Sequence, residues 1–312
     1  MKIEKKQWFR PAASGREDIF SQLWVCEDKS RLRAIVQVAH GMSETVERYD
    51  DFSQFLAQHG FLVCMNEHAG HGQHAKTLGY FSEKNGAHFL TEDMKNLMDE
   101  VTTEYNADAR LPVFLMGHSM GSFLAREYIT QYGEVLRGVI LSGTAGKNAA
   151  LALGKTLARI QKKAKGDQSV GKMLTIMAFG SYCKKIENPV NRCAWLSRDE
   201  AVCIAYQQDP YCGFPFTASG FYDLFALMEE VNHKSWAAKV PKDLSIFLFS
   251  GSDDPVGGYG KGVIEVYRSL ISSGHEDVTA TLYPGGRHEM LNEINKEEVY
   301  ADVVAWLESK ID

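Results

Sequence analysis

Apolar runs and segments of helical periodicity alternate along the first part of the chain. The apolar runs have the length of strands buried on both faces, and they cover residues 33–39, 61–65, 113–116 and 135–141. Between them, a helical pattern covers residues 49–59. Two further helices are expected, one that begins with Thr91 as its N-cap and one that begins near Met120. Strands that alternate with helices predict an α/β fold, with a mostly parallel central sheet flanked by helices.

This alternation stops after residue 144 and resumes near residue 239. Between them, residues 145–238 show helical and loop patterns and no convincing strand. The later pattern predicts strands at 244–249 and 278–283 and helices at 263–272 and 297–310. A loop of that length without structure is not expected in a compact domain. We therefore predict a helical cap, residues 145–238, inserted into a core domain of residues 1–144 and 239–312.

Composition narrows the classes of function. The 312 residues are 45% hydrophobic and 24% charged, with a net charge of −6. A mildly acidic chain without a dense Lys/Arg stretch is not expected to bind nucleic acid. No apolar run approaches the roughly 18 residues of a membrane span, and residues 1–11 lack the apolar core of a secretory signal. The six scattered cysteines form no CxxC pair, so we expect reduced thiols and a cytoplasmic protein.

One pentapeptide offers a nucleophile. Residues 117–121 read Gly-His-Ser-Met-Gly, which matches G-x-S-x-G and places Ser119 between an apolar strand and a helix. This context is the nucleophile elbow of α/β-hydrolases, in which a serine hydroxyl stands above the end of the sheet. The alternative is a helix N-cap serine after a glycine turn. The flanking elements favour the nucleophile.

A serine nucleophile needs a histidine base and an acid that orients this base. In this fold both follow the serine in the sequence. His288 follows the last expected strand, at the sheet edge where ligands bind, whereas His233 and His275 are expected on the surface. The loop after the preceding strand contains Asp253 and Asp254. We favour Asp254, which the next proline holds in an extended conformation, and Asp253 remains an alternative.

The oxyanion of a tetrahedral intermediate needs backbone N–H donors. We expect one donor from Met120, directly after the serine, and another from Met42 in the loop after the strand at 33–39. A plain turn at His40–Gly41 is the alternative for this loop.

Five segments in this order resemble the monoacylglycerol lipase and lysophospholipase branch of the α/β-hydrolase fold family. They are His40–Glu44, Gly70–Gly72, Gly117–Gly121, Gly251–Val256 and Tyr283–Glu289. The resemblance covers nearly the whole chain outside the expected cap. It implies cleavage of esters in monoacylglycerols, lysophospholipids or simpler esters, without a cofactor. It also implies that Asp254, directly before a proline, is the acid of the triad.

The loop after the second expected strand departs from the pattern of this family. Relatives commonly have Asp-x-Arg-Gly-His-Gly-x-Ser, whereas Asn66, His68, Ala69 and His74 replace the Asp, the Arg, the first Gly and the Ser here. These replacements bear on any salt bridge of that loop and leave the triad untouched. Histidines spaced by three could bind zinc, but the intervening glycines indicate a loop, so we expect no metal site.

Apolar residues of the expected cap offer a wall for an acyl chain. A helical stripe runs from Phe221 to Met228, and packing onto the core is its alternative role. The candidate substrate-binding residues are Phe214, Phe216, Phe221 and Phe225. Such a cap could also touch a membrane surface transiently to collect substrate. The basic run at 161–166 is expected to be a solvated helix face.

These features predict a serine hydrolase that cleaves carboxylic esters of a small-molecule or lipid-like substrate through a Ser-His-Asp triad and an acyl-enzyme. The alternatives on the same scaffold are a general carboxylesterase, a thioesterase or an aminopeptidase. A receptor with an inactive triad is the alternative from another class. The sequence does not indicate the acyl chain, the head group or the oligomeric state.

Overall fold

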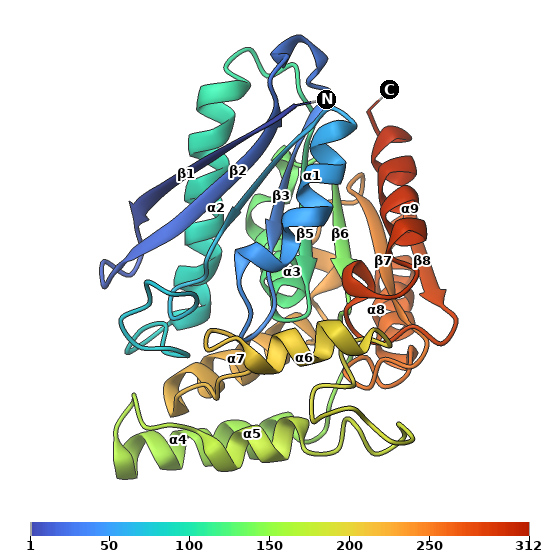
Figure 1. The fold of residues 1–312 in the computed structure, drawn as a ribbon. Coiled ribbons are helices and arrows are strands. Elements are labelled where there is room, and N and C mark those ends of the chain that lie inside the picture. The colour runs from blue at the N-terminus through green and yellow to red at the C-terminus, as the bar shows by residue number, and fades with distance from the viewer. Residues whose placement is uncertain (1, 312) are drawn as a thin grey trace.

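The computed structural model describes residues 2–311, and its sheet has the strand order β1-β2-β4-β3-β5-β6-β7-β8 (Figure 1). The strands are β1 (Ile3–Pro11), β2 (Asp18–Cys26), β3 (Ala34–Ala39), β4 (Phe61–Asn66), β5 (Val113–His118), β6 (Gly138–Ser142), β7 (Ser245–Gly251) and β8 (Val278–Tyr283). Strands β3 to β8 pair in parallel, and β2 pairs antiparallel with both β1 and β4. This topology confirms the predicted α/β fold.

Helices pack on both faces of the sheet. One face is covered by α1 (Asp50–Gln58) and α9 (Lys296–Glu308). The other face is covered by α2 (Gly86–Tyr105), α3 (Met120–Tyr132) and α8 (Lys261–Ser272). Successive strand residues point to opposite faces, so Ile35 and Val36 of β3 belong to different core clusters. Burial on both sides explains why the inner strands β3 to β7 are largely apolar runs.

The N-terminal hairpin of β1 and β2 was not predicted from the sequence. It extends the sheet at one edge, and most side chains of β1 are exposed or half-exposed. Edge strands carry charges such as Lys5 and Lys6 that discourage pairing with other chains. The same charged residues interrupt the apolar pattern by which a strand is recognised in a sequence.

Two predicted boundaries were wrong. Thr91 does not cap a helix: α2 already begins at Gly86, and the buried Thr91 hydroxyl donates to Glu127 at 3.0 Å. Strand β6 begins at Gly138 rather than at residue 135, because residues 133–135 form a 3₁₀ turn that ends α3. Val135 is accordingly 64% exposed, and its apolar character did not reflect burial.

Four helices between β6 and β7 lie at the carboxyl end of the sheet (Figure 1). They are α4 (Leu151–Lys165), α5 (Lys172–Phe179), α6 (Glu200–Gln208) and α7 (Ala218–Val231). Helix α7 packs on α3, while α4 packs on α7 and forms the outermost layer with α5. The division into a core and a cap at residues 145 and 238 stays a prediction. No helix within residues 2–311 has the length and apolar character that a membrane span requires.

Candidate active site

Ser119 lies in a sharp turn between β5 and α3. Its φ of 53° and ψ of −118° are unusual for a residue with a side chain, and such strain persists only where the surroundings enforce it. A Cβ on Gly117 would lie 2.2 Å from the Gly121 carbonyl oxygen, and a Cβ on Gly121 would lie 2.1 Å from that of Ala39. Both glycines are therefore required sterically, as the pentapeptide predicts. The Ser119 N–H donates to the Ser142 carbonyl at 2.9 Å.

His288 and Asp254 follow the neighbouring strands β8 and β7. The His288 Nδ1 atom lies 2.9 Å from Asp254 Oδ2, and both residues are buried. The other donors to Asp254 are the Ser250 hydroxyl at 2.7 Å and the Val256 N–H at 2.8 Å. Asp253, in contrast, is exposed and accepts a hydrogen bond from the adjacent Ser252. The geometry thus brings Asp254, and not Asp253, to the histidine.

Electrostatics favour the charged form of each partner. Burial raises the pKa of Asp254, but the His288 charge and three hydrogen bonds bring this pKa below its ordinary value. For His288 the effects have the opposite signs. Burial alone would lower its pKa, but the Asp254 carboxylate more than offsets this, so the pKa of His288 is raised. A base with a raised pKa is a stronger proton acceptor for a nearby hydroxyl.

The second ring nitrogen of His288, Nε2, is buried and bonds to no protein group within residues 2–311. Ser119 and His288 line one cavity, although their side chains are not hydrogen-bonded to each other here. Catalytic hydrogen bonds are often long in free enzymes and tighten with substrate. His288 thus lines the same cavity as Ser119 and keeps one ring nitrogen without a partner among residues 2–311.

Met42 and Met120, whose N–H groups are expected to bind an oxyanion, line the same cavity. Neither Met42 nor Met120 donates its N–H to another group in the part of the chain that the structure describes. Met120 is the first residue of α3, where N–H groups lack helical acceptors and the helix dipole favours negative charge. A Cβ on Gly41 would lie 3.1 Å from the Ser119 Cβ, so the loop with Met42 directly adjoins the serine.

Glu44 organises this loop and was given no role by sequence reasoning. Its Oε1 accepts hydrogen bonds from the Gly41 N–H and from the Tyr49 hydroxyl, the latter at 2.8 Å. Its Oε2 lies 3.3 Å from Arg48 Nε, and Arg48 also pairs with Glu289, next to the histidine. The only sequence signal was that Glu44 lies within the segment His40–Glu44.

His118 contributes a second imidazole that the sequence did not single out. Its ring centroid lies 4.7 Å from that of His288, and its Nδ1 lies 3.1 Å from the Ser142 hydroxyl oxygen. Burial, aided by the charge of His288, lowers the pKa of His118 to about 3. His118 is therefore a neutral side chain that packs against His288.

The cavity above Ser119 has a volume of about 260 Å³ and a largely apolar lining. Phe214 and Phe225 line it, as expected of substrate-binding residues. Phe216 and Phe221 do not: both are fully buried, 5.8 Å apart between ring centroids, in an aromatic cluster that joins α7 to the core. These two side chains therefore pack in the interior instead of lining an acyl-chain site.

Other histidines lie away from this cavity. His40, His68 and His71 pack together, and burial lowers the pKa of His68 and of His71 well below the ordinary value. Within residues 2–311, no three His, Cys, Asp or Glu side chains are arranged to hold a metal ion. His233 is exposed as expected, but His275 is not: its ring is buried, with Nδ1 3.0 Å from the Leu270 carbonyl oxygen.

Comparison with known proteins gives a consistent result. The model of the family described as serine aminopeptidase, S33, matches residues 30–295. The chain is 27% identical over 284 residues to a monoacylglycerol lipase from Mycolicibacterium smegmatis, covering 89% of each chain. It is 25% identical over 304 residues to the monoglyceride lipase of Rattus norvegicus, covering 94% of this chain and 88% of that one.

A solved structure agrees over the full length. A thermostable carboxyl esterase from Bacillus coagulans, crystallised with glycerol, is 30% identical and superimposes with a TM-score of 0.91 over 99% of both chains. The strand order, the strained serine and these similarities lead to one assignment. The chain belongs to the serine aminopeptidase S33 family of α/β-hydrolases and is an ester hydrolase of the lipase and esterase type.

Proposed function

We propose that the protein cleaves carboxylic esters of lipid-like substrates, such as monoacylglycerols or lysophospholipids, by a Ser-His-Asp mechanism. Ser119 attacks the ester carbonyl while His288 accepts the hydroxyl proton and then protonates the leaving alcohol. Asp254 holds His288 in the useful tautomer and stabilises its cation. The N–H groups of Met42 and Met120 stabilise the oxyanion. Water then hydrolyses the acyl-enzyme by the same route.

The observation that carries this proposal is a strained serine that lines one cavity together with a histidine already paired with a carboxylate. Ser119 has dihedral angles that few non-glycine residues adopt. His288 keeps one nitrogen bonded to Asp254 and the other free in the same cavity. The N–H groups of Met42 and Met120, which have no acceptor among residues 2–311, would complete the set of groups that ester cleavage by acyl transfer requires.

The proposed substrate class rests on the walls of the cavity. Besides Phe214 and Phe225, the lining includes Leu174, Leu224 and Met228 from α5 and α7. Burial of an acyl chain contributes roughly 0.8 kcal/mol for each CH₂ group. Residues 145–238 thus act as a cap that supplies most of the apolar wall, whereas the core supplies the reacting groups.

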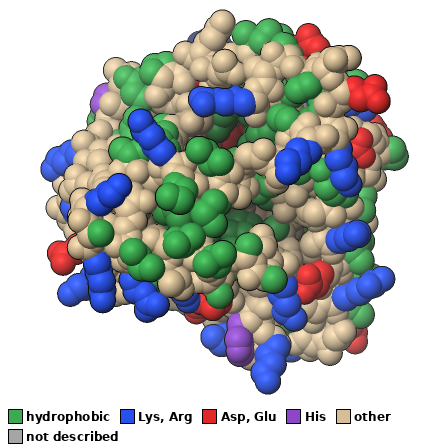
Figure 2. Space-filling model, turned by 90° about the horizontal axis from the view of Figure 1, so that it is seen from below, with side chains coloured by type: hydrophobic (Ala, Val, Ile, Leu, Met, Phe, Trp, Pro, Cys, Tyr) green, Lys and Arg blue, Asp and Glu red, His purple; other side chains and the backbone are tan. Residues whose placement is uncertain are grey.

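The outer face of the cap supports contact with a lipid surface. Met173 and Ile176 of α5 are 67% and 71% exposed, and Leu153 and Ile160 of α4 are each 57% exposed. Figure 2 shows apolar side chains around a hollow on this face, with Lys and Arg around them. Residues 145–197 carry ten Lys or Arg and two Asp or Glu, although the whole chain is acidic. We therefore propose transient docking on anionic lipid, where each such cation contributes about 1 kcal/mol.

Vesicle sedimentation tests this docking. Wild type should bind vesicles that contain phosphatidylglycerol more strongly than pure phosphatidylcholine, and less strongly at high salt. Lys163→Glu with Lys165→Glu should weaken binding, whereas Lys2→Glu with Lys29→Glu, at the other end of the molecule, should not. Equal binding by both double variants would contradict the proposal.

The activity itself is tested with a panel of substrates. Wild type should hydrolyse monoacylglycerols, lysophospholipids or p-nitrophenyl esters faster than peptide amides, and Ser119→Ala should abolish turnover while keeping the fold. Preference for N-terminal peptide amides would instead identify an aminopeptidase, and preference for thioesters a thioesterase. Slow labelling of Ser119 without product release would identify a receptor with an inactive triad.

A further inference from the structure

A segment of the cap is bonded directly to the loop that carries His288. We call residues 194–199 the anchor segment and residues 285–289 the histidine loop. Their hydrogen bonds run from Glu289 N to Leu196 O (2.7 Å), from His288 N to Trp195 O (3.4 Å), and from Arg287 Nη1 to Ala194 O (2.7 Å) and Ser197 O (2.9 Å). The backbone of the histidine loop, which carries His288, is therefore held in place partly by the cap.

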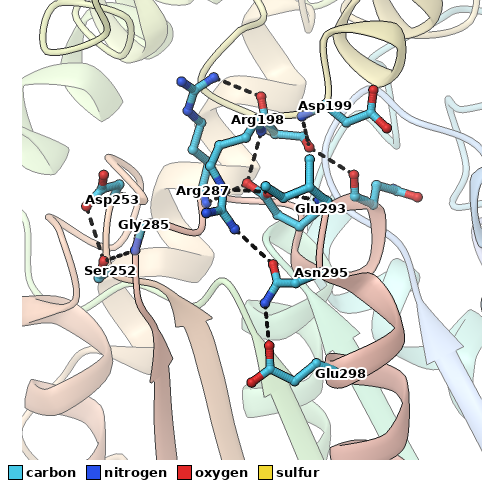
Figure 3. A network of polar contacts seen from close by, with 12 residues as sticks. Arg198, Asp199, Ser252, Asp253, Gly285, Arg287, Glu293, Asn295 and Glu298 are labelled. Carbon is cyan, nitrogen blue, oxygen red and sulfur yellow. Dashed lines mark hydrogen bonds and ion pairs between the residues drawn. The ribbon is translucent and has the colours of Figure 1, made fainter.

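The carboxylate of Glu293 lies between these two segments (Figure 3). Its Oε1 accepts hydrogen bonds from the N–H of Arg287, in the histidine loop, at 2.9 Å and from the N–H of Arg198, in the anchor segment, at 3.0 Å. Its Oε2 accepts from Arg198 Nε at 2.9 Å and from the N–H of Ile294 at 3.0 Å. One side chain thus bonds to both segments at once.

Burial of the Glu293 carboxylate makes its hydrogen bonds to both segments necessary. The Glu293 side chain is 0% exposed, and the Arg198 side chain is 28% exposed. A buried carboxylate is tolerated only when its oxygens are fully hydrogen-bonded. Glutamine is nearly isosteric but offers one acceptor oxygen and an NH₂ group that faces a donor. Glu293→Gln would therefore keep the volume and lose part of the bonding.

The anchor segment also touches the reacting group. The Trp195 ring centroid lies 5.2 Å from that of His288, and Trp195 lines the cavity above Ser119. A shift of the anchor segment would therefore move a wall of the cavity and the ring that packs on the base. Displacement of about 1 Å at a reacting group can cost 10²-fold in rate.

We propose that Glu293 is a positioning residue for the ester hydrolysis proposed above, on which this inference rests. It acts through Arg287 and Arg198, and it holds the histidine loop and the anchor segment in the one arrangement that presents His288 to the cavity. It does not touch the substrate.

The test compares Glu293→Gln with Glu298→Gln, using hydrolysis of a short p-nitrophenyl ester. Glu298 ends the same chain of polar contacts through Asn295, but it is exposed and does not bond to Glu293. Rates are divided by the concentration of active sites from fluorophosphonate titration, so that loss of folded protein does not count. We expect Glu293→Gln to lower kcat tenfold to a hundredfold, to change KM less than threefold, and to shift the pH midpoint of labelling. Glu298→Gln should match wild type.

A second variant covers the case in which Glu293→Gln does not fold. Arg198→Gln removes the side-chain bonds from Nε to Glu293 and from Nη2 to Asn295, whereas the backbone N–H groups of residues 198 and 287 still bond to Glu293. With the contact between the two segments weakened in this way, kcat per active site should fall several-fold. A structural role alone would lower the unfolding temperature while kcat per active site and the pH midpoint stay at wild-type values, and that result would overturn the inference. Loss of activity in Ser119→Ala alongside it would leave the proposed function intact.

Discussion

The Nδ1 atom of His288 lies 2.9 Å from Oδ2 of Asp254, and these residues follow strands that are neighbours in the sheet. Parallel strands end at the same edge, so two loops separated in sequence deliver their side chains to one point. The proposed chemistry depends on this pair, because it sets both the orientation and the proton affinity of the base.

The pair predicts a specific pH dependence. Only neutral His288 can accept the serine proton, and the Asp254 carboxylate raises the pKa of His288 above its ordinary 6.5. We expect the rate of fluorophosphonate labelling to rise with pH, with a midpoint above 6.5. A midpoint at or below 6.5 would contradict the assignment of this base.

Stability should depend on pH through the same pair. The raised pKa of His288 means that its contribution is full below pH 6.5 and is lost as pH rises through the folded-state pKa. The lowered pKa of Asp254 means that its contribution is full above pH 3.8 and is lost as pH falls through the folded-state pKa. Both contributions are full between pH 3.8 and pH 6.5. Urea unfolding should show that Asp254→Asn loses the most stability, relative to wild type, within this range of pH. An equal loss from pH 3 to pH 9 would contradict the coupling.

Glu44 should support catalysis through the oxyanion loop. Its carboxylate accepts the Gly41 N–H and thereby fixes the backbone next to the Met42 N–H. Loss of one oxyanion donor costs about 10²–10³ in kcat, so a donor that is only loosened in Glu44→Ala should cost about tenfold to a hundredfold. Steady-state kinetics on a soluble ester should show this in kcat rather than in KM. Exposed Glu47→Ala is the control, and equal rates for both variants would contradict the role.

Gly154 should control the length of acyl chain that the cavity accepts. A Cβ at this position would lie 2.9 Å from Phe225 Cε2, so a larger residue must push into the apolar wall. Gly154→Val should lower kcat/KM for long-chain monoacylglycerols by roughly fourfold per excluded CH₂, since each contributes about 0.8 kcal/mol. Short esters should be unaffected. Exposed Ala152→Val, on the same helix, should leave the chain-length profile unchanged; a matching change there would contradict the assignment.

Arg126 should stabilise the two junctions of the cap. Its guanidinium is buried and donates to the carbonyl oxygens of Ala145 and Val231 and to Asn232, and it lies 4.3 Å from the ring centroid of Trp236. Arg126→Met leaves buried acceptors unpaired, which costs about 1–3 kcal/mol for each group. With three acceptors affected, urea unfolding should report a loss of about 3 kcal/mol or more. Exposed Arg159→Met should be near neutral, and a similar loss there would contradict the explanation.

Much of the fold could be predicted because buried parallel strands are apolar on both faces. The expected strand at 61–65 lies within β4, in which every residue is buried, and the elbow at Ser119 lies where the pentapeptide placed it. The hairpin β1–β2 was missed because its edge strand carries lysines rather than an apolar pattern. Thr91 was misread because a buried hydroxyl within a helix looks like an N-cap when the partner, Glu127, lies on another helix.

In the candidate site, too, some residues could be predicted from the sequence and others could not. Ser119, Asp254 and His288 could be chosen as candidates because each lies in a short loop after a strand, where sequence position implies spatial position. Glu44 and Glu293 could not be chosen in this way, since the roles proposed for them depend on which backbone N–H groups the tertiary fold brings to them. Cap aromatics were harder still, because burial in a core and exposure in a cavity demand the same residue types.

The central claim is that Ser119 is the nucleophile activated by His288. Wild-type protein is incubated with a fluorophosphonate at pH 8, and the adduct is located by peptide mass spectrometry. We predict one adduct per chain, on Ser119, with labelling abolished in Ser119→Ala and strongly slowed in a His288→Ala variant of unchanged fold. Full labelling of Ser119→Ala, or an adduct on another residue of the wild type, would contradict the claim.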